Sequence, residues 1–214
     1  DLDLIIVNCD FTQASGNCVY IIPEINSLTV EGCNFTAPSG ASSYQKQYLI
    51  WPYKAKTITV INNTFDGKGI TRAAIHLGDG HPDGTSATIS GNEFKNFERG
   101  VQVAFTNDAQ NSISINNNTF DNIVLSDKTI SQYYEVATVF IHENTGLNTE
   151  ISYNDNHLTG DSARMFYSEN QSVAPVDIVK EFSGNTISGV SAGTIEDNSF
   201  SPWVVSIGNE NYKS

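Results

Sequence analysis

The chain has 214 residues, with 11 Lys or Arg against 24 Asp or Glu, and its formal net charge is −13 at pH 7. This length is sufficient for one domain with a continuous apolar core. The acidic charge disfavours nucleic acids and anionic membranes as partners, and no apolar run in the sequence approaches the roughly 18 to 20 residues of a membrane helix. The composition therefore predicts no nucleic-acid binding and no membrane insertion.

A short phrase returns eight times along the chain. It has two apolar positions separated by one residue, then Asn or Cys three positions on, and then Phe or a substitute two positions later. The copies are Leu4, Ile6, Cys9, Phe11; Leu28, Val30, Cys33, Phe35; Ile58, Val60, Asn63, Phe65; Ala87, Ile89, Asn92, Phe94; Ile113, Ile115, Asn118, Phe120; Ile151, Tyr153, Asn156, Leu158; Lys180, Phe182, Asn185, Ile187; and Gly193, Ile195, Asn198, Phe200. The last two copies lie too close together for a full coil, so either one matches by chance or the end of the repeat is irregular.

Each copy reads as a strand, a corner and a second short strand. The apolar residues alternate with the period of a strand that buries one face, and this alternation slips by one residue before the Asn. A slip requires a bend, and Asn tolerates the left-handed conformation that a tight corner needs. Another strand follows most copies, at 19–22, 48–51, 74–77, 101–105, 139–141, 165–167 and 204–207. No segment has a convincing helical stripe, the best candidate being 122–136.

Short strands without crossover helices, repeating every 24 to 30 residues in most copies, predict a solenoid. The expected fold is all-β: a right-handed, single-stranded parallel β-helix of about seven coils. In that geometry Asn63, Asn92, Asn118 and Asn156 stack as an asparagine ladder. The alternative is a β-sandwich with Asn-rich turns.

Residues 58–65 and 112–120 carry the phrase in its clearest form. In these segments the chain resembles the right-handed parallel β-helix of the pectate lyase-like superfamily, and specifically the generic parallel β-helix repeats of many secreted and surface proteins. The resemblance covers nearly the whole chain and implies that ligands lie along one exposed sheet. We expect residues 1–214 to form a single domain, a fragment of a larger protein that lacks its N-terminal cap, because a solenoid needs capped ends.

Two cysteines take the corner position that Asn holds elsewhere. Cys9 and Cys33 lie one coil apart, which is close enough for a disulfide in principle, although side chains in a stack are nearly parallel. The alternative is two reduced thiols packed as small apolar groups, with Cys18 nearby.

The strands that follow the copies of the repeat form a third set. Cationic residues precede several of these strands by a similar number of residues. Stacked on one another, Lys46, Arg72, Arg99 and Arg164 would follow the carboxylates or sulfates of a sugar chain. The alternative is a solvated strand edge paired with neighbouring acids, such as Glu98.

Acidic residues follow the same strands. Oxygen ligands on adjacent loops suit Ca²⁺, and the candidate ligands are Asp79, Asp83, Glu143 and Glu169. The alternative is a set of ordinary turns, because Asp-Gly pairs are common there.

A lyase reaction needs a base and a positive group that stabilises the resulting anion. The candidate catalytic residues are Arg72, His76 and His142. The paired aspartates of the superfamily's hydrolases have no match, since Asn63-Thr64 continues to Phe65 and Gly80-His81 continues to Pro82. The lyase signature that contains Arg is not recognisable either.

Alternation along the third set of strands predicts an apolar outer face, larger than a soluble monomer usually exposes. Either the stretch 121–137, another chain or a sugar ring would cover it. Tyr48 and Tyr167 on this face are suited to stacking on sugars. The residues predicted to point outward are Val19, Ile21, Tyr48, Ile50, Val139, Ile141, Met165, Tyr167 and Ile207.

The first functional hypothesis is a secreted or cell-surface domain, of the adhesin type, that binds a glycan or a surface protein without chemistry. The second is a polysaccharide lyase or glycoside hydrolase acting on an acidic polysaccharide. The third is a structural spacer or fibre segment. Catalysis requires Arg72, His76, Asp79 and His142 to converge in one groove, whereas a platform allows them to be scattered.

Overall fold

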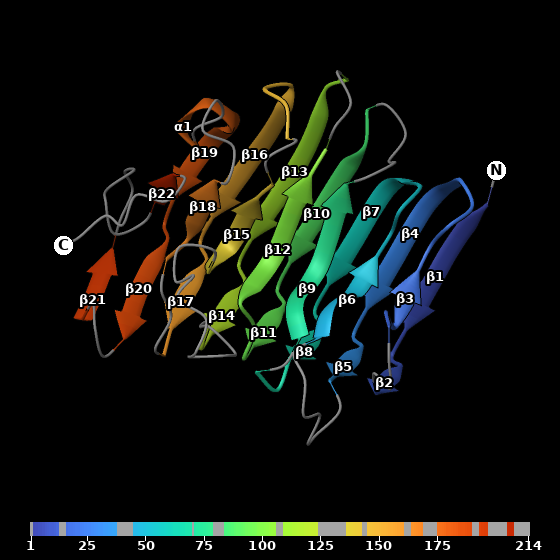
Figure 1. Cartoon of the computed structure of the whole chain (residues 1–214), viewed down its shortest axis with the longest axis horizontal. Helices are drawn as coiled ribbons and strands as arrows, with labels where there is room; N and C mark the ends of the chain where they lie inside the picture. The colour runs from blue at the N-terminus through green and yellow to red at the C-terminus, as the bar shows by residue number, and fades with distance from the viewer. Residues whose placement is uncertain are drawn as a thin grey trace.

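A computed structural model describes residues 2–12, 16–37, 45–69, 71–78, 84–105, 109–123, 136–142, 145–160, 164–168, 175–189, 193–196 and 205–207. The chain is a right-handed parallel β-helix built from three sheets of seven, eight and seven strands in the described part (Figure 1). Successive coils stack from the N-terminal strand β1 at one end to β20 and β21 at the other. The predicted solenoid of about seven coils is confirmed.

The first sheet carries the two apolar residues of each repeat. It contains β1 (Asp3–Val7), β4 (Ile25–Glu31), β7 (Ala55–Ile61), β10 (Ser86–Ser90), β13 (Asn111–Asn116), β16 (Thr149–Asn154) and β19 (Val179–Ser183).

The second sheet carries the aromatic position of each repeat. It contains β2 (Asp10–Thr12), β5 (Asn34–Thr36), β8 (Thr64–Asp66), β11 (Glu93–Lys95), β14 (Thr119–Asp121), β17 (His157–Thr159), β20 (Thr186–Gly189) and β21 (Gly193–Glu196). The last strand, β21, pairs antiparallel with β20, so the copy at Gly193 and Ile195 is not a further coil.

The third sheet contains β3 (Val19–Tyr20), β6 (Gln45–Trp51), β9 (Thr71–Gly78), β12 (Arg99–Ala104), β15 (Ala137–Ile141), β18 (Phe166–Ser168) and β22 (Val205–Ile207). A four-residue helix, α1 (Pro175–Ile178), precedes β19. The predicted helix candidate at 122–136 lies almost entirely outside the described residues. None of the helices within the described ranges has the length and apolar character needed to span a membrane.

A buried ladder of corner side chains joins the coils. The amide of each ladder residue donates to the side-chain oxygen of the next one, at 2.9 Å from Asn63 to Asn92 and 3.0 Å from Asn92 to Asn118. The same side chains donate backwards to a backbone carbonyl, as Asn118 Nδ2 does to Ile89 O at 2.9 Å. The ladder continues through Asn156 and Asn185, so the prediction is confirmed and extended.

The left-handed conformation belongs to the residue before the ladder position. Asn62 and Asn117 have φ of 56° and 57°, and Gly91 takes the same place with φ of 67°. The prediction that the ladder asparagine itself adopts this conformation is therefore wrong. Asn62 and Asn117 make the turn and are exposed. The side chain of the ladder residue that follows each of them can therefore point into the core.

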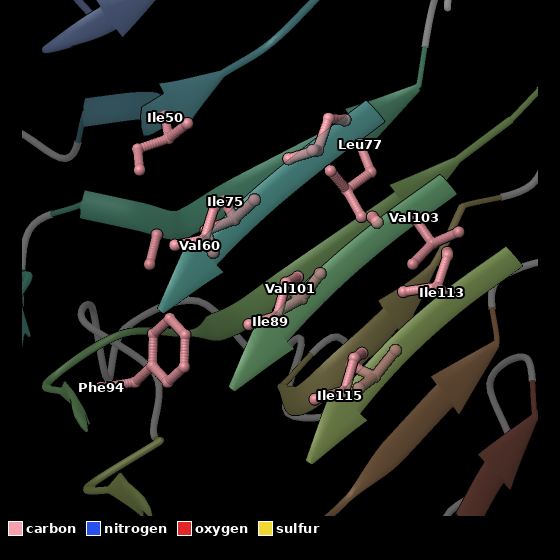
Figure 2. Packing of buried hydrophobic residues seen from close by; sticks show 14 of the residues in the cluster. Ile50, Val60, Ile75, Leu77, Ile89, Phe94, Val101, Val103, Ile113 and Ile115 are labelled. Carbon is pink, nitrogen blue, oxygen red and sulfur yellow. The ribbon is translucent and has the colours of Figure 1, made fainter. Parts of the chain in front are cut away.

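Stacked rings fill the core beside the second sheet. Phe11, Phe35, Phe65, Phe94 and Phe120 lie with neighbouring ring centroids 4.8 to 5.0 Å apart and interplanar angles of 4° to 11°. Rows of Ile and Val from the first and third sheets meet opposite them, as Figure 2 shows. This spacing equals the distance between neighbouring strands, so the ring stack follows from the coil repeat.

The outward apolar face predicted for the third sheet is wrong. Its aliphatic residues belong to the buried core: Val19, Ile21, Ile50, Val139, Ile141 and Met165. The cause is a second slip in alternation, because Leu49 and Ile50 are both buried. Tyr48 and Tyr167 do lie on the outer face, whereas the side chain of Ile207 is not among those described. Residues 124–135, from the stretch proposed as a cover, also lie outside the described part of the chain.

The three cysteines are not bonded to one another. Cys9 and Cys33 occupy the first two ladder positions, where the Cys9 amide donates to Cys33 Sγ at 3.4 Å. Cys33 in turn donates from its amide to Asn63 Oδ1 at 2.8 Å. Of the two alternatives, the pair of reduced thiols is therefore the one observed.

Removing one ladder amide should destabilise the whole stack. Asn118→Ala would take from the buried Asn92 amide its acceptor and from the Ile89 carbonyl its side-chain donor, so we expect a loss of about 3 kcal/mol in the free energy of unfolding. Chemical denaturation measures this loss. The matched control is Asn117→Gly, at an exposed left-handed position that glycine also adopts, and it should change stability by less than about 0.5 kcal/mol. Equal effects of the two substitutions would contradict the role of the ladder.

Burial of Cys18 should make stability fall in alkaline solution. Desolvation raises the pKa of its thiol from 9.0 to about 11. The folded state therefore keeps this proton at pH values where the unfolded chain has lost it, and the free energy of unfolding should fall between pH 9 and 11. Denaturation midpoints measured across this range should fall less steeply in Cys18→Ala. An identical slope in the variant would show that Cys18 does not contribute.

Candidate functional site

One row of outward side chains crosses the third sheet in register. Tyr20 pairs with Trp51, His76 with Gln102, Gln102 with Phe140, and Phe140 with Tyr167. Since Ile50 pairs with Ile75, Trp51 lies beside His76 and joins the two halves of the row. These six residues alternate with the inward aliphatic row, and we call them the outer row: Tyr20, Trp51, His76, Gln102, Phe140 and Tyr167.

Aromatic rings gather at the N-terminal end of the outer row. The Tyr20 ring stacks on Trp51 with centroids 4.8 Å apart, and the rings of Tyr53, Tyr48 and His76 meet Trp51 edge-on at 5.6, 5.6 and 5.2 Å. The Tyr20 side chain is exposed, at 43%, whereas Tyr48, Trp51 and Tyr53 are half-buried. We call these five residues the aromatic cluster. It offers an accessible ring surface on a rigid strand framework.

Trp51 also carries a buried polar group, its indole N–H. Its indole Nε1 is buried, and no hydrogen-bond acceptor lies within reach among the described residues. Buried Trp N–H groups usually find a partner, since leaving one unmade costs free energy. The aromatic cluster thus combines stacking surface with a buried donor for which the described residues offer no acceptor.

A buried guanidinium supports the middle of the outer row. Arg99 is 1% exposed, lies 3.3 Å from the centroid of the Phe140 ring, and donates from Nη1 to Gln102 Oε1 at 2.7 Å. Gln102 Nε2 donates to the hydroxyl of Tyr48 at 3.2 Å. Tyr48 stacks on His76 with centroids 4.2 Å apart. Arg99 and Gln102 therefore hold one edge of the aromatic cluster in place.

The C-terminal end of the row contains a second cation near an aromatic ring. Phe140 and Tyr167 stack with centroids 5.4 Å apart, and the Arg164 guanidinium lies 6.0 Å from the Tyr167 ring. Burial lowers the pKa of Arg164, and the neighbouring Tyr167 opposes this shift. Both rings are almost fully buried, so this end presents much less accessible ring surface than the aromatic cluster.

The predicted stack of four cations forms only in part. Arg99 pairs with Ala73 rather than Arg72, so Arg72 lies one position out of register. Arg99 also pairs with Ala137 on the next strand. The Thr138 amide donates to the Arg164 carbonyl, which places Arg164 beside Ala137 on the other side. Arg99 and Arg164 therefore belong to one row, with Ala137 between them. The side chain of Lys46 lies outside the described ones. Irregular pairing between β6 and β9 accompanies this loss of register.

The predicted catalytic residues lie apart on the third sheet. Arg72 and His76 are four residues apart on β9, a separation of about 13 Å in an extended strand. The His142 amide donates to the Val103 carbonyl, which places His142 level with Ala104 and two coils from β9. Two strand spacings amount to about 10 Å. Asp79, the fourth member of the predicted groove, lies outside the described residues.

The four predicted Ca²⁺ ligands, Asp79, Asp83, Glu143 and Glu169, also lie outside the described residues. Within the part of the chain that the structure describes, no group of three or more His, Cys, Asp and Glu side chains could hold a metal ion.

Sequence reasoning missed Trp51, Gln102 and Phe140 as members of the site. Trp51 and Phe140 follow Ile50 and Val139, two residues that the predicted alternation had turned outward. Consecutive apolar pairs near the start of these strands, such as Leu49 and Ile50, carry the signal of a slip.

The link between Arg99 and Tyr48 should depend on an acceptor at position 102. Gln102→Leu would remove the oxygen that accepts from the buried Arg99 guanidinium, so we expect a loss of about 2 kcal/mol in the free energy of unfolding. Gln102→Glu keeps an acceptor there and should retain most of the stability at neutral pH. Thermal denaturation should show that Gln102→Glu is more stable than Gln102→Leu. The reverse order of stability would contradict the prediction.

Comparisons with family models, with curated proteins and with solved structures gave no match to this chain.

Proposed function

We propose that this chain is a non-catalytic glycan-binding domain, secreted or displayed at a cell surface. The observation that carries the proposal is the aromatic cluster, in which Tyr20 is exposed and stacked on Trp51. Aromatic rings offer a large contact area with little loss of side-chain freedom, and they suit the apolar faces of sugar rings. The parallel strands hold the rings at fixed spacings, so little ordering is needed on binding.

The polar groups around the aromatic cluster favour an oxygen-rich ligand. The indole N–H of Trp51 lacks an acceptor among the described residues, and Lys54 Nζ lies 5.9 Å from the Tyr53 ring. The three arginines of the chain all lie at or just before strands of this same sheet, although the net charge is −13. Lys54, beside the Tyr53 ring, would favour a glycan that carries some negative charge, whereas the Arg99 side chain is buried.

The resemblance of the repeats to the pectate lyase-like superfamily supports carbohydrate as the ligand class. We include membership of that superfamily in the proposal. The separation of Arg72, His76 and His142 along the third sheet favours binding over a lyase or hydrolase reaction. The aromatic cluster favours binding over a role as a spacer or fibre segment, because a spacer has no need of an accessible ring surface.

Glycan binding should depend on the ring at position 20. A glycan array on the full chain would first identify a ligand, and a titration followed by Trp fluorescence would then give its Kd. Tyr20→Ala should weaken binding about five- to tenfold, as expected from the loss of roughly 1 kcal/mol of ring stacking. Tyr20→Phe keeps the ring and should bind within about twofold of the parent chain. No binding on the array, or equal affinity of Tyr20→Ala, would overturn the proposal.

Catalysis is tested on the same sample. Incubation with uronate polysaccharides, with Ca²⁺ and with chelator, should give no new ultraviolet absorbance from unsaturated products. Absorbance that disappears in Arg72→Ala would replace this proposal by a polysaccharide lyase.

A further inference from the structure

Hydroxyl side chains occupy the outward positions of the first sheet in four consecutive coils. Strands β4, β7, β10 and β13 lie side by side in this sheet (Figure 1). On each strand, two Ser or Thr residues flank one buried apolar residue, so both hydroxyl groups point away from the core. We call these eight residues the hydroxyl face: Ser27, Thr29, Thr57, Thr59, Ser86, Thr88, Ser112 and Ser114.

Backbone pairing aligns the hydroxyl face into two rows. Successive partners in the first row are Ser27, Thr57, Ser86 and Ser112. Successive partners in the second row are Thr29, Thr59, Thr88 and Ser114. No register shift interrupts the pairing of these four strands. Neighbouring positions are therefore about 4.8 Å apart across the strands and about 6.6 Å apart along them, which makes a regular two-dimensional array.

The hydroxyl face contains no charged residue, although the net charge of the chain is −13. Charged residues return at its borders, at Glu31 and Glu150. The fold does not impose this composition, because outward positions of the second sheet in the same coils carry both acids and a lysine. These charged residues are Asp66, Glu93, Lys95 and Asp121. The absence of charge is therefore a property of this one face.

Most hydroxyl groups of this face are available to a partner outside the protein. Ser27 Oγ donates to Asp3 Oδ1, and Ser114 Oγ accepts from Asn116 Nδ2, both at 2.6 Å. The other six hydroxyl groups have no hydrogen-bond partner among the described residues, and none of the eight side chains is buried. Threonine is stiff about χ1 because it branches at Cβ. The rigid strands thus hold hydroxyl and methyl groups at fixed places.

These properties match the surface of ice. A hydroxyl group both donates and accepts hydrogen bonds, as a water molecule does. The water molecules of ice form a rigid lattice that excludes ions, and its surface repeats are similar in size to the two spacings of the hydroxyl face. A rigid array also needs little ordering on binding. A sugar surface would instead call for aromatic rings, and the hydroxyl face has none.

We propose that the hydroxyl face binds ice through water molecules ordered over its eight side chains. Each side chain contributes a weak contact, and the regular array makes these contacts simultaneous. The hydroxyl face belongs to the first sheet, whereas the aromatic cluster lies at the third sheet. Ice binding is therefore an activity separate from glycan binding.

Uptake of the full chain into slowly growing ice tests the proposal. Ice grown on a cold finger from a dilute solution should incorporate more of the parent chain than of an acidic reference protein of similar size. Thr59→Lys places a charge and a long side chain within the array, so it should reduce the incorporated protein about tenfold. The matched control is Thr64→Lys, which makes the same exchange at a half-buried outward position of the second sheet in the same coil. It should be incorporated like the parent chain.

Incorporation of the parent chain no greater than that of the reference protein would overturn the proposal. Equal losses in Thr59→Lys and Thr64→Lys would also overturn it, because the added charge and not its position would then decide the result. Binding to crystalline cellulose that Thr59→Lys abolishes, without uptake into ice, would replace ice by a flat polysaccharide as the partner. Circular dichroism of both variants verifies that the fold is retained.

Discussion

The buried ladder of corner side chains is the interaction on which the rest of the structure depends. Each ladder asparagine accepts from the backbone of one coil and donates to the backbone of the same coil, as Asn92 does with Asn63 N and Val60 O. These groups are buried, so leaving any of them unpaired would cost free energy. The ladder therefore fixes each coil relative to the next at one point of the cross-section, and all three sheets follow from that point.

Because the register between coils is fixed, residues at equivalent positions of successive coils form rows. The stacked phenylalanines of the core and the outer row of the third sheet are two results of the same constraint. On the inside, rows of like residues fill the axis. On the outside, unlike residues such as His76, Gln102 and Phe140 come side by side from segments far apart in the sequence. Trp51 and Tyr20 meet for the same reason, and their contact forms the accessible part of the candidate site.

The same constraint makes the ends of the solenoid different from its middle. An interior coil has its edges and its core covered by a neighbour on each side. At the end of the second sheet, β21 supplies that cover by turning back along β20. At the first coil, Leu4 and Ile6 remain partly exposed and the nearby acids are bound to the second coil.

Much of the fold could be predicted from the sequence because its determinants are local. The alternation in Ile58 and Val60, the corner at Asn63 and the ring at Phe65 lie within one short segment, and each copy repeats them. The ladder followed from the recurrence of Asn at one place in the phrase. The position of the left-handed residue did not, because Asn62 and Asn63 are the same residue type and only the burial of one distinguishes them.

The sequence by itself determined the coil, the ladder and the approximate strands of all three sheets. Only the tertiary structure decided which side chains of the third sheet face outward and which of them share a row. The slip that buries both Leu49 and Ile50 leaves only a pair of consecutive apolar residues in the sequence, and this pair does not specify on which residue the alternation restarts. The alignment of Arg99 with Ala73 instead of Arg72 depends on pairing between strands, which the spacing of residues within one strand does not specify. For these reasons Tyr48 and Tyr167 could be assigned to the outer face, whereas Trp51, Gln102 and Phe140 required the folded chain.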